Sequence, residues 1–346
     1  SWTEVGDMNT GRSQFGTGGT TTDGIVAGGR IPAKTANTEH WNGSTWTEVA
    51  NLAVARSDTN AGGGVSTSFL IAGGETATAY VASTEEFSAA GITDSIINIG
   101  QVYYRSDTGD MKVTLNVLGT GAWASGGNLN TARYDVTGAG SQTAALATGG
   151  YVSGPGSALT ELYDGSSWTE VNDLNTGRYG QASTGSQTSA LAAGGTPPVT
   201  GATEKWDGTN WTESGDLNTA RRNAASAGAD NEGVICFGGQ PPQRANAEVF
   251  DGTNWTEVND LNQARHVLYG TGISTAALGA GGNLPPAPYT ANTEIWNGSS
   301  WTEVAEMNSA KGRGGMSGSS TLSLVFGGTN GPSVVAVTEQ WNGSAW

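Results

Sequence analysis

An eleven-residue motif recurs along most of this chain, and its spacing limits the folds that the chain can adopt. The motif reads Trp-Thr-Glu-Val-Asn-Asp-Leu-Asn-Thr-Gly-Arg at 168–178. Its seven full copies begin with Trp2, Trp46, Trp123, Trp168, Trp211, Trp255 and Trp301, and an eighth starts at Trp346. The intervals between these tryptophans are 44, 77, 45, 43, 44, 46 and 45 residues. A period in the mid-forties indicates a repeat architecture.

Each repeat contains four segments that are typical of short strands. Trp-Thr-Glu-Val comes first; a stretch rich in small residues, an apolar run ending in Gly-Gly, and Thr-Glu-x-aromatic follow. Asp-Gly or Asn-Gly then precedes the next Trp. These pairs favour hairpins, because Gly accepts the positive φ of the turn. No segment shows a sustained helical period, so we expect no helices.

Four strands per repeat predict an all-β fold in which four-stranded antiparallel sheets surround an axis, a β-propeller. Residues 1–346 would form a single domain of seven blades. All twelve tryptophans fall on two repeat positions. Large aromatic rings at matched positions on successive sheets are expected to pack blade against blade.

The repeats resemble kelch repeats over nearly the whole chain. The shared features are Gly-Gly after an apolar strand, Glu-x-aromatic, a Trp one turn later, and Arg about ten residues beyond it. The resemblance implies six or seven blades and a ring closed by a terminal strand. Here Trp2–Val5 would complete the sheet built from Arg313–Trp341. Because Trp2 and Trp346 are equivalent, one of them is expected to lie outside the ring.

One repeat is longer than the others by about 33 residues, between Phe87 and Trp123. Two alternating runs flank Asp-Thr-Gly-Asp at 107–110, which predicts a β-hairpin insertion at 89–122 within the second blade. The segment Gly100–Ser106 resembles hairpins of fibre and structural proteins of tailed bacteriophages, and Gly121–Gly127 resembles repeats of marine phage virion proteins. We expect this insertion on the face opposite the variable loops, where it could dock the propeller to an assembly.

Composition narrows the range of partners. The net charge of −16 argues against binding to nucleic acid and to anionic membrane surfaces. No apolar run reaches the length of a membrane-spanning helix. The one cysteine, Cys236, lies in an apolar run and is expected to be buried, with no intrachain disulfide. Since both ends fall within a repeat, we expect a segment of a longer polypeptide or a processed product.

Catalytic and metal motifs are not apparent in the sequence. The two histidines, His40 and His266, lie in different repeats without ligands at metal spacing. Copper oxidases and sialidases among known propellers need a Tyr–Cys crosslink with His ligands, or an arginine cluster with Asp-box turns, and neither pattern is present. We therefore expect no enzyme activity, no metal and no cofactor. A hydrolase or lyase that uses the central cavity stays open as a less favoured alternative.

A basic residue ends each full motif. These residues are Arg12, Arg56, Arg133, Arg178, Arg221, Arg265 and Lys311. Glutamates recur in register at Glu39, Glu85, Glu161, Glu204, Glu248, Glu294 and Glu339. We expect each basic residue to pair with a strand Glu and to tie neighbouring blades, because buried charges are usually paired. Anion binding in a polar channel is the competing interpretation.

The loops after Gly-Gly vary in length and sequence, and in a propeller they share one face. Loops on a rigid scaffold are where recognition is placed. The candidate contact residues are Arg30, Lys34, Tyr80, Tyr151, Pro197, Pro241, Arg244, Pro286 and Tyr289. Tolerated surface variation is the alternative explanation.

The favoured function is a non-enzymatic structural or adhesion module of a phage virion, in a fibre, tail or capsid surface. Its partners would be other virion proteins or a glycan or protein on the host surface, without nucleic acid or membrane insertion; homo-oligomers stay open. A secreted or surface bacterial propeller that binds glycans or proteins is the alternative. The location would be the virion, or else the cell exterior.

Overall fold

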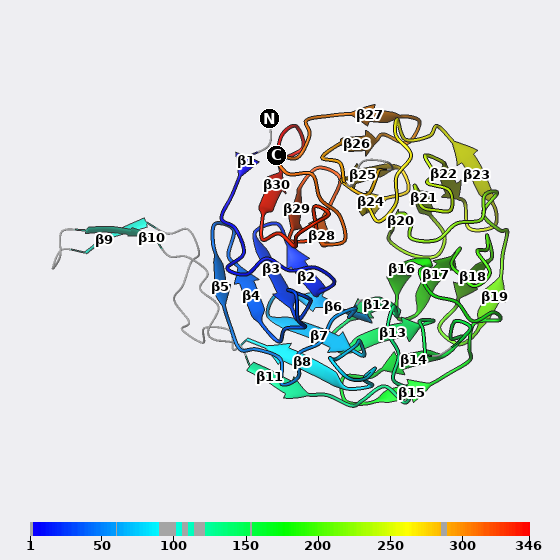
Figure 1. Cartoon of the computed structure of the whole chain (residues 1–346), viewed down its shortest axis with the longest axis horizontal. Helices are drawn as coiled ribbons and strands as arrows, with labels where there is room; N and C mark the ends of the chain where they lie inside the picture. Colours follow the sequence, from blue (N-terminus) through cyan, green and yellow to red (C-terminus); the bar gives the residue numbers. More distant parts are fainter. Residues whose placement is uncertain are drawn as a thin grey trace.

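The computed structural model describes residues 3–59, 61–89, 102–105, 110–113, 122–152, 154–284 and 289–346. Seven four-stranded sheets stand side by side in a ring around a central axis (Figure 1). Adjacent strands within each sheet are antiparallel, and these residues include no helix. The predicted all-β propeller of seven blades is confirmed. Within the described ranges, no helix combines the length and the apolar character needed to span a membrane.

Each blade starts with its innermost strand and continues outward. Blade 1 contains β2 (Gly16–Thr20), β3 (Asp23–Ala27), β4 (Thr38–Trp41) and β5 (Trp46–Glu48). Blade 2 contains β6 (Ala61–Val65), β7 (Ser68–Ala72), β8 (Thr84–Ser88) and β11 (Ala122–Ser125). Blade 3 contains β12 (Thr137–Ser141), β13 (Ala144–Thr148), β14 (Thr160–Tyr163) and β15 (Trp168–Glu170).

The second half of the ring follows the same plan. Blade 4 contains β16 (Ala182–Ser186), β17 (Ser189–Ala193), β18 (Thr203–Trp206) and β19 (Trp211–Glu213). Blade 5 contains β20 (Ala225–Gly228), β21 (Val234–Phe237), β22 (Ala247–Phe250) and β23 (Trp255–Val258). Blade 6 contains β24 (Tyr269–Ile273), β25 (Ala276–Ala280), β26 (Thr293–Trp296) and β27 (Trp301–Glu303). Blade 7 contains β28 (Gly315–Gly318), β29 (Ser323–Phe326), β30 (Thr338–Trp341) and β1 (Thr3–Glu4).

Blade 7 is built from both ends of the chain. β1 pairs with β30 through Thr3 opposite Gln340 and Glu4 opposite Glu339. Trp346 is buried and packs on Trp341 with ring centroids 5.3 Å apart. This matches the packing of Trp46 on Trp41 in blade 1, at 5.5 Å. Trp346 therefore fills the core position of blade 7, while Trp2 lies outside the described residues.

The predicted insertion falls largely outside the described residues. Two strands are described there, β9 (Val102–Arg105) and β10 (Asp110–Val113), which pair with each other in a separate two-stranded sheet (Figure 1). β8 and β11 pair directly, with Ser88 opposite Ala122. The insertion with its bounds of 89–122 stays a prediction.

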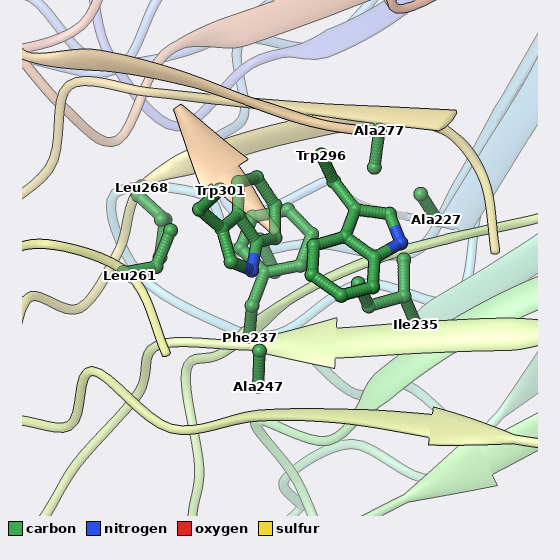
Figure 2. Packing of buried hydrophobic residues seen from close by; sticks show 10 residues of the cluster. Ala227, Ile235, Phe237, Ala247, Leu261, Leu268, Ala277, Trp296 and Trp301 are labelled. Carbon is green, nitrogen blue, oxygen red and sulfur yellow. The ribbon is translucent and has the colours of Figure 1, made fainter. Parts of the chain in front are cut away.

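The core consists of layers between neighbouring blades. Figure 2 shows one layer, where Trp296 and Trp301 of blade 6 meet Ile235 and Phe237 of blade 5. Phe237 and Trp301 have ring centroids 4.7 Å apart. The ten tryptophans with described side chains, at both repeat positions, are buried, as their spacing predicted. Each fully buried ring of this size removes a large apolar area from water, so these layers dominate the stability of the ring.

The innermost strands consist mostly of small residues because the next blade fills the space beside them. A Cβ on Gly18 of β2 would meet Cδ2 of Phe69, in blade 2, at 2.7 Å. Hydroxyl groups also form hydrogen bonds between these strands: Thr184 Oγ1 of β16 donates to the carbonyl oxygen of Gly228 in β20 at 2.6 Å. The small residues of each repeat thus allow seven strands to approach one axis.

Candidate binding face at the channel mouth

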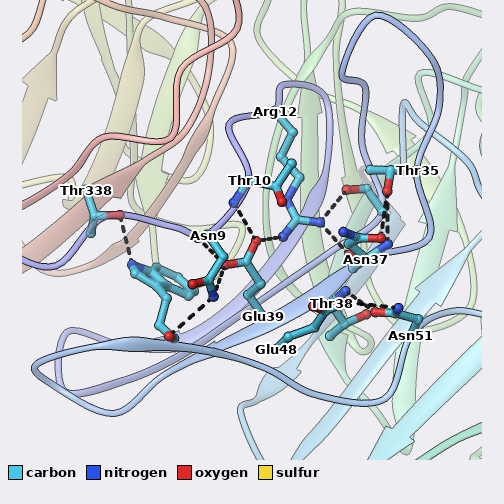
Figure 3. Close-up of polar contacts among 12 residues, drawn as sticks. Asn9, Thr10, Arg12, Thr35, Asn37, Thr38, Glu39, Glu48, Asn51 and Thr338 are labelled. Atoms are coloured by element: carbon cyan, nitrogen blue, oxygen red, sulfur yellow. Dashed lines mark hydrogen bonds and ion pairs between the residues drawn. The ribbon is translucent and has the colours of Figure 1, made fainter.

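The basic residues that end the motifs are buried and paired with the repeat glutamates, as expected from their register. The pairs are Arg12–Glu39, Arg56–Glu85, Arg133–Glu161, Arg178–Glu204, Arg221–Glu248, Arg265–Glu294 and Lys311–Glu339. In blade 1, Arg12 also donates to the carbonyl oxygen of Asn37, and Glu39 accepts from the backbone and side chain of Asn9 (Figure 3). These contacts hold the connection that leads into each blade.

The expected tie between neighbouring blades needs a correction. Arg12 precedes β2, and Glu39 lies on β4, so the pair fixes an incoming connection to its own blade. Tryptophans bridge the neighbouring blades instead. Trp46 Nε1 of blade 1 donates to Thr338 Oγ1 of blade 7 at 2.9 Å (Figure 3). Trp168 of blade 3 donates in the same way to Thr84 of blade 2, at 2.7 Å.

We define the loop face as the surface made by the loops after Gly-Gly together with the Trp-to-Arg connections. The two sets meet directly: the residue after each basic residue bridges the residue after Gly-Gly, as in Ser13 with Arg30 and Tyr134 with Tyr151. The turns between the third and fourth strands lie at the other end of the blades, where Gly43 adjoins Thr22. The variable loops therefore share one face, and β8 ends toward the opposite one.

The predicted contact residues differ in solvent exposure and in the bonds they make to neighbouring residues. Arg30, Pro197 and Pro241 are exposed, and Tyr80 is 37% exposed. Lys34 instead binds the loop of blade 2, with its Nζ 2.8 Å from Glu75 Oε2 and 2.6 Å from the carbonyl oxygen of Thr76.

Two other predicted contact residues do not join the tyrosine contacts of Tyr80 and Tyr151. Half-buried Arg244 donates to the carbonyl oxygen of Pro241 at 3.2 Å. Half-buried Tyr289 lies beside Gly312. It belongs to blade 6, whereas Tyr80 and Tyr151 belong to blades 2 and 3. Pro286 lies outside the described residues.

Four tyrosines form a continuous cluster on the loop face of blades 2 to 4. The ring centroids of Tyr80 and Tyr134 are 4.8 Å apart, those of Tyr134 and Tyr151 are 5.1 Å apart, and those of Tyr151 and Tyr179 are 5.4 Å apart. Tyr80 and Tyr151 were predicted contact residues, and the structure brings them together. Tyr134 and Tyr179, each directly after a structural Arg, were not predicted. Such rings offer apolar faces and polar hydroxyls at low entropic cost.

The mouth of the central channel is surrounded by seven residues with positive φ, one per blade. Each stands two positions after a structural basic residue, and we call the set the mouth ring. Its members, with φ in degrees, are Gln14 (59), Asp58 (57), Asp135 (53), Gly180 (65), Asn223 (53), Val267 (49) and Arg313 (56). Backbone hydrogen bonds join five of the seven successive pairs: Asp58 N, for example, donates to Gln14 O at 2.9 Å, and Asn223 N donates to Gly180 O at 2.9 Å. Neighbouring blades thus hold one another at the axis.

The mouth ring encloses a cavity of about 270 Å³. Its lining residues are Gln14, Phe15, Asp58, Asp135, Asn223, Val267, Leu268, Tyr269, Arg313 and Gly314. Within it, Gln14 Nε2 donates to Asp58 Oδ1 at 2.6 Å, and Ser57 Oγ donates to Asp58 Oδ2 at 2.9 Å. Below the mouth, a second cavity of about 480 Å³ lies among small residues of the innermost strands, including Thr17, Thr137 and Ser226.

The charges at the mouth are distributed unevenly. Burial and then nearby Asp58 raise the pKa of Asp135 to about 6, against the opposing effects of Arg313 and Arg222. Burial also raises the pKa of Asp58. On the other side of the mouth, burial and then Arg313 and Arg222 lower the pKa of His266. Blades 2 and 3 therefore supply acidic groups and blades 5 to 7 supply basic groups.

The acidic and basic groups at the mouth do not repeat from blade to blade, and no catalytic motif in the sequence pointed to them. The seven equivalent positions carry four kinds of side-chain chemistry: acidic, basic, neutral polar and apolar, with one Gly. The signal was the third residue of Arg-Ser-Gln, Arg-Ser-Asp, Arg-Tyr-Asp and their counterparts, a variable column inside an otherwise repeated segment. Among the described residues, no group of His, Cys, Asp and Glu is arranged to hold a metal ion.

No protein-family model matches the chain, and a search of curated proteins finds no match. The β-propeller architecture therefore rests on the sheet topology, and the kelch and phage resemblances remain interpretations of the sequence.

Proposed function

We propose that this chain is a non-enzymatic recognition module whose loop face binds a glycan or a protein on a cell surface. One contrast carries the proposal. The buried positions repeat sevenfold, whereas the mouth ring and the tyrosine cluster differ from blade to blade. A residue type that repeats in every blade serves the ring, whereas variation confined to one face of a rigid scaffold is typical of a binding surface.

The proposed setting is a tailed-phage virion, in a fibre, tail or capsid surface. It is supported by the kelch-like repeats and by the resemblance of Gly100–Ser106 to hairpins of phage fibre proteins. β8 ends and β11 begins at the end of blade 2 away from the loop face, where Ser88 pairs with Ala122. That position would let the insertion contact other virion proteins while the loop face stays open. Deletion of 89–121 should then abolish assembly with a virion partner and preserve ligand binding. A secreted or surface bacterial protein is the alternative setting.

A hydrolase or lyase is the second candidate, because two carboxylates with raised pKa lie at the mouth. Glycosidases need a protonated acid and an ionised carboxylate in position. Asp135, with its pKa near 6, and Asp58 have the required chemical types. Release of new reducing ends from a bound polysaccharide, lost in Asp135→Asn, would establish this candidate and refute the non-enzymatic proposal.

The test of recognition is binding of the purified chain to whole bacterial cells and to a glycan array. The variant is Tyr80→Ala with Tyr151→Ala, and the matched control is Tyr163→Phe, which removes a hydroxyl that bonds Glu86 away from the loop face. We expect saturable binding that the double variant loses and the control keeps. Equal binding by all three proteins, or no binding to any surface, would contradict a recognition role for this face.

A further inference from the structure

We propose that the loop face binds an acidic saccharide, with a sugar carboxylate at Arg222 and Arg313 and sugar rings against the tyrosine cluster. The inference rests on the proposed recognition function and specifies the chemical class of its ligand. It starts from the distribution of cations on a chain whose net charge is −16.

Most cations with described side chains are paired. The seven structural basic residues bind glutamates, Lys34 binds Glu75, and Lys205 binds Glu232 at 2.7 Å. In this described set, four arginines make no ion pair: Arg30, Arg222, Arg244 and Arg313. All four lie on the loop face, in the loops after Gly-Gly or next to the structural basic residues. An acidic protein that gathers its unpaired cations on one face offers an anion site there.

Arg222 and Arg313 lie closest to the mouth. Arg313 is an exposed member of the mouth ring and lines its cavity. Arg222 bridges Gln240, and its Nε is buried without a hydrogen-bond partner among the described residues. Both guanidinium groups act on His266 and on Asp135. A partly buried guanidinium without an ion-pair partner, such as that of Arg222, is costly, and a bound carboxylate would supply both charge and paired acceptors.

The part of the loop face on blades 2 to 4 offers aromatic rings and polar groups that suit the binding of sugar rings. Tyr134, Tyr151 and Tyr179 form its surface, and Asp58 and Gln14 line the mouth beside it. Between this part and the arginines stands Gly180, where even a Cβ would lie 2.9 Å from Asn223 Oδ1. Gly180 thus brings no side chain to the mouth ring at blade 4, next to Tyr179, and the side chain of Asn223 occupies the adjoining space. A chain of sugar rings could pass over Gly180 and Asn223 from the tyrosines to the arginines.

The acidic residues at the mouth select among anions. Carboxylates accept hydrogen bonds from sugar hydroxyls, but they repel ligands with closely spaced phosphates. A uronate polymer has one carboxylate per ring and several hydroxyls, so it fits both parts of the face. An acidic peptide would satisfy the arginines but would supply few donors to Asp58 and Asp135.

The experiment measures binding of the whole chain to polygalacturonate, to alginate and to carboxyl-reduced polygalacturonate, with poly-glutamate as the peptide probe. Arg222→Gln and Arg313→Gln are the variants. Lys205→Gln is the control, since it removes the same charge near Glu232 and Gly252 at the opposite end of the blades. We expect binding to at least one uronate polymer and roughly tenfold to hundredfold weakening in each arginine variant, because each loses a charge-assisted pair. The control should bind like the original chain.

Each other outcome has a definite meaning. The acidic-saccharide proposal is wrong if the chain binds the carboxyl-reduced polymer as well as the uronate. It is also wrong if both arginine variants bind uronate as the original chain does. Either result leaves the proposed recognition function in place. Tighter binding to poly-glutamate than to either uronate also overturns the acidic-saccharide proposal, in favour of an acidic peptide. Binding to cells without binding to any uronate polymer would also refute the acidic-saccharide proposal and leave the recognition function in place. Failure to bind cells and all polymers refutes the recognition function itself.

Discussion

Lys311 is the single departure from arginine among the buried basic residues, and it makes a weaker pair. Its Nζ lies 3.3 Å from Glu339 Oε1 and donates to the carbonyl oxygen of Val337 at 2.8 Å. Arg221 at the equivalent position reaches Glu248 at 2.6 Å and Asn246 at 2.8 Å with separate nitrogens. A planar fork with two donors suits this site better than a single ammonium.

Lys311→Arg should therefore stabilise the ring. We expect a gain of about 1 kcal/mol in the free energy of unfolding, the usual size for restoring a repeat's common residue. Burial lowers the pKa of Lys311 from 10.5 to about 8, so the folded state bears the cost of a buried ammonium below pH 8 and loses that cost as the pH rises toward 10.5. The advantage of Arg should be larger at pH 7 than near pH 10.

Thermal or urea unfolding of both proteins across this pH range measures the effect. Arg221→Lys is the reciprocal control, and it should lose a similar amount. An advantage of Arg that does not change with pH would show that Lys311 keeps its ordinary pKa.

Asp135 is expected to lower the stability of the folded chain at neutral pH. Its pKa is raised from 3.8 to about 6, so the folded state holds the proton more tightly than the unfolded state does. Stability from this group is fully present below about pH 3.8 and is lost as the pH rises through 6. Asp135→Asn should stabilise the chain by roughly 1–3 kcal/mol at pH 7.5 and by little at pH 4. Unfolding at both pH values measures this difference, and equal effects at both would contradict it.

At the scale of elements, the connection into each blade has two parts: one repeats in sequence from blade to blade, and the other varies. The segment from Asn9 to Arg12 is fixed by the buried Glu39 and repeats with it. The next two residues form the loop face and the mouth ring, and no two blades carry the same pair of side chains there. The first part builds the ring, and the second is free to vary because its backbone is held by neighbouring connections.

The repeats predict the blades well, because each strand, hairpin and buried Trp is set by contacts that recur in every copy. The mouth ring was missed for a physical reason. Positive φ is usually signalled by Gly, Asn or Asp, yet three of its positions carry Gln, Val and Arg. That conformation is imposed by hydrogen bonds from blades distant in the sequence, such as Val267 N to Asn223 O at 3.1 Å. The tyrosine cluster likewise depends on blades 2, 3 and 4 meeting.

Val267 is the most strained member of the mouth ring, because a β-branched residue at φ of 49° is crowded by its own backbone. Val267→Asn should relieve this strain and stabilise the chain by about 1 kcal/mol. The reciprocal change, Asn223→Val at φ of 53°, should destabilise it by a similar amount. Chemical unfolding of the two variants measures both effects, and destabilisation by both would show that the apolar contacts of Val267 outweigh the strain.

At the scale of the whole molecule, closure of the ring makes blade 7 equivalent to the others. β28 contacts β2 of blade 1 as the other innermost strands contact their neighbours. Ser317 of β28 also donates to the carbonyl oxygen of Gly19 in β2. Blade 7 thus takes a strand from the start of the chain and a core tryptophan from its end.

This equivalence predicts that the final residue is as important as a residue in the middle. Trp346 is fully buried against Trp341, and Trp301 is 7% exposed against Trp296. Trp346→Ala should therefore cost about 3–5 kcal/mol, the usual range for a large core ring, and Trp301→Ala should cost a similar amount. Urea unfolding of the two variants tests this. An effect of Trp346→Ala below about 1 kcal/mol, the size expected for a frayed surface residue, would mean that blade 7 does not close the ring in solution.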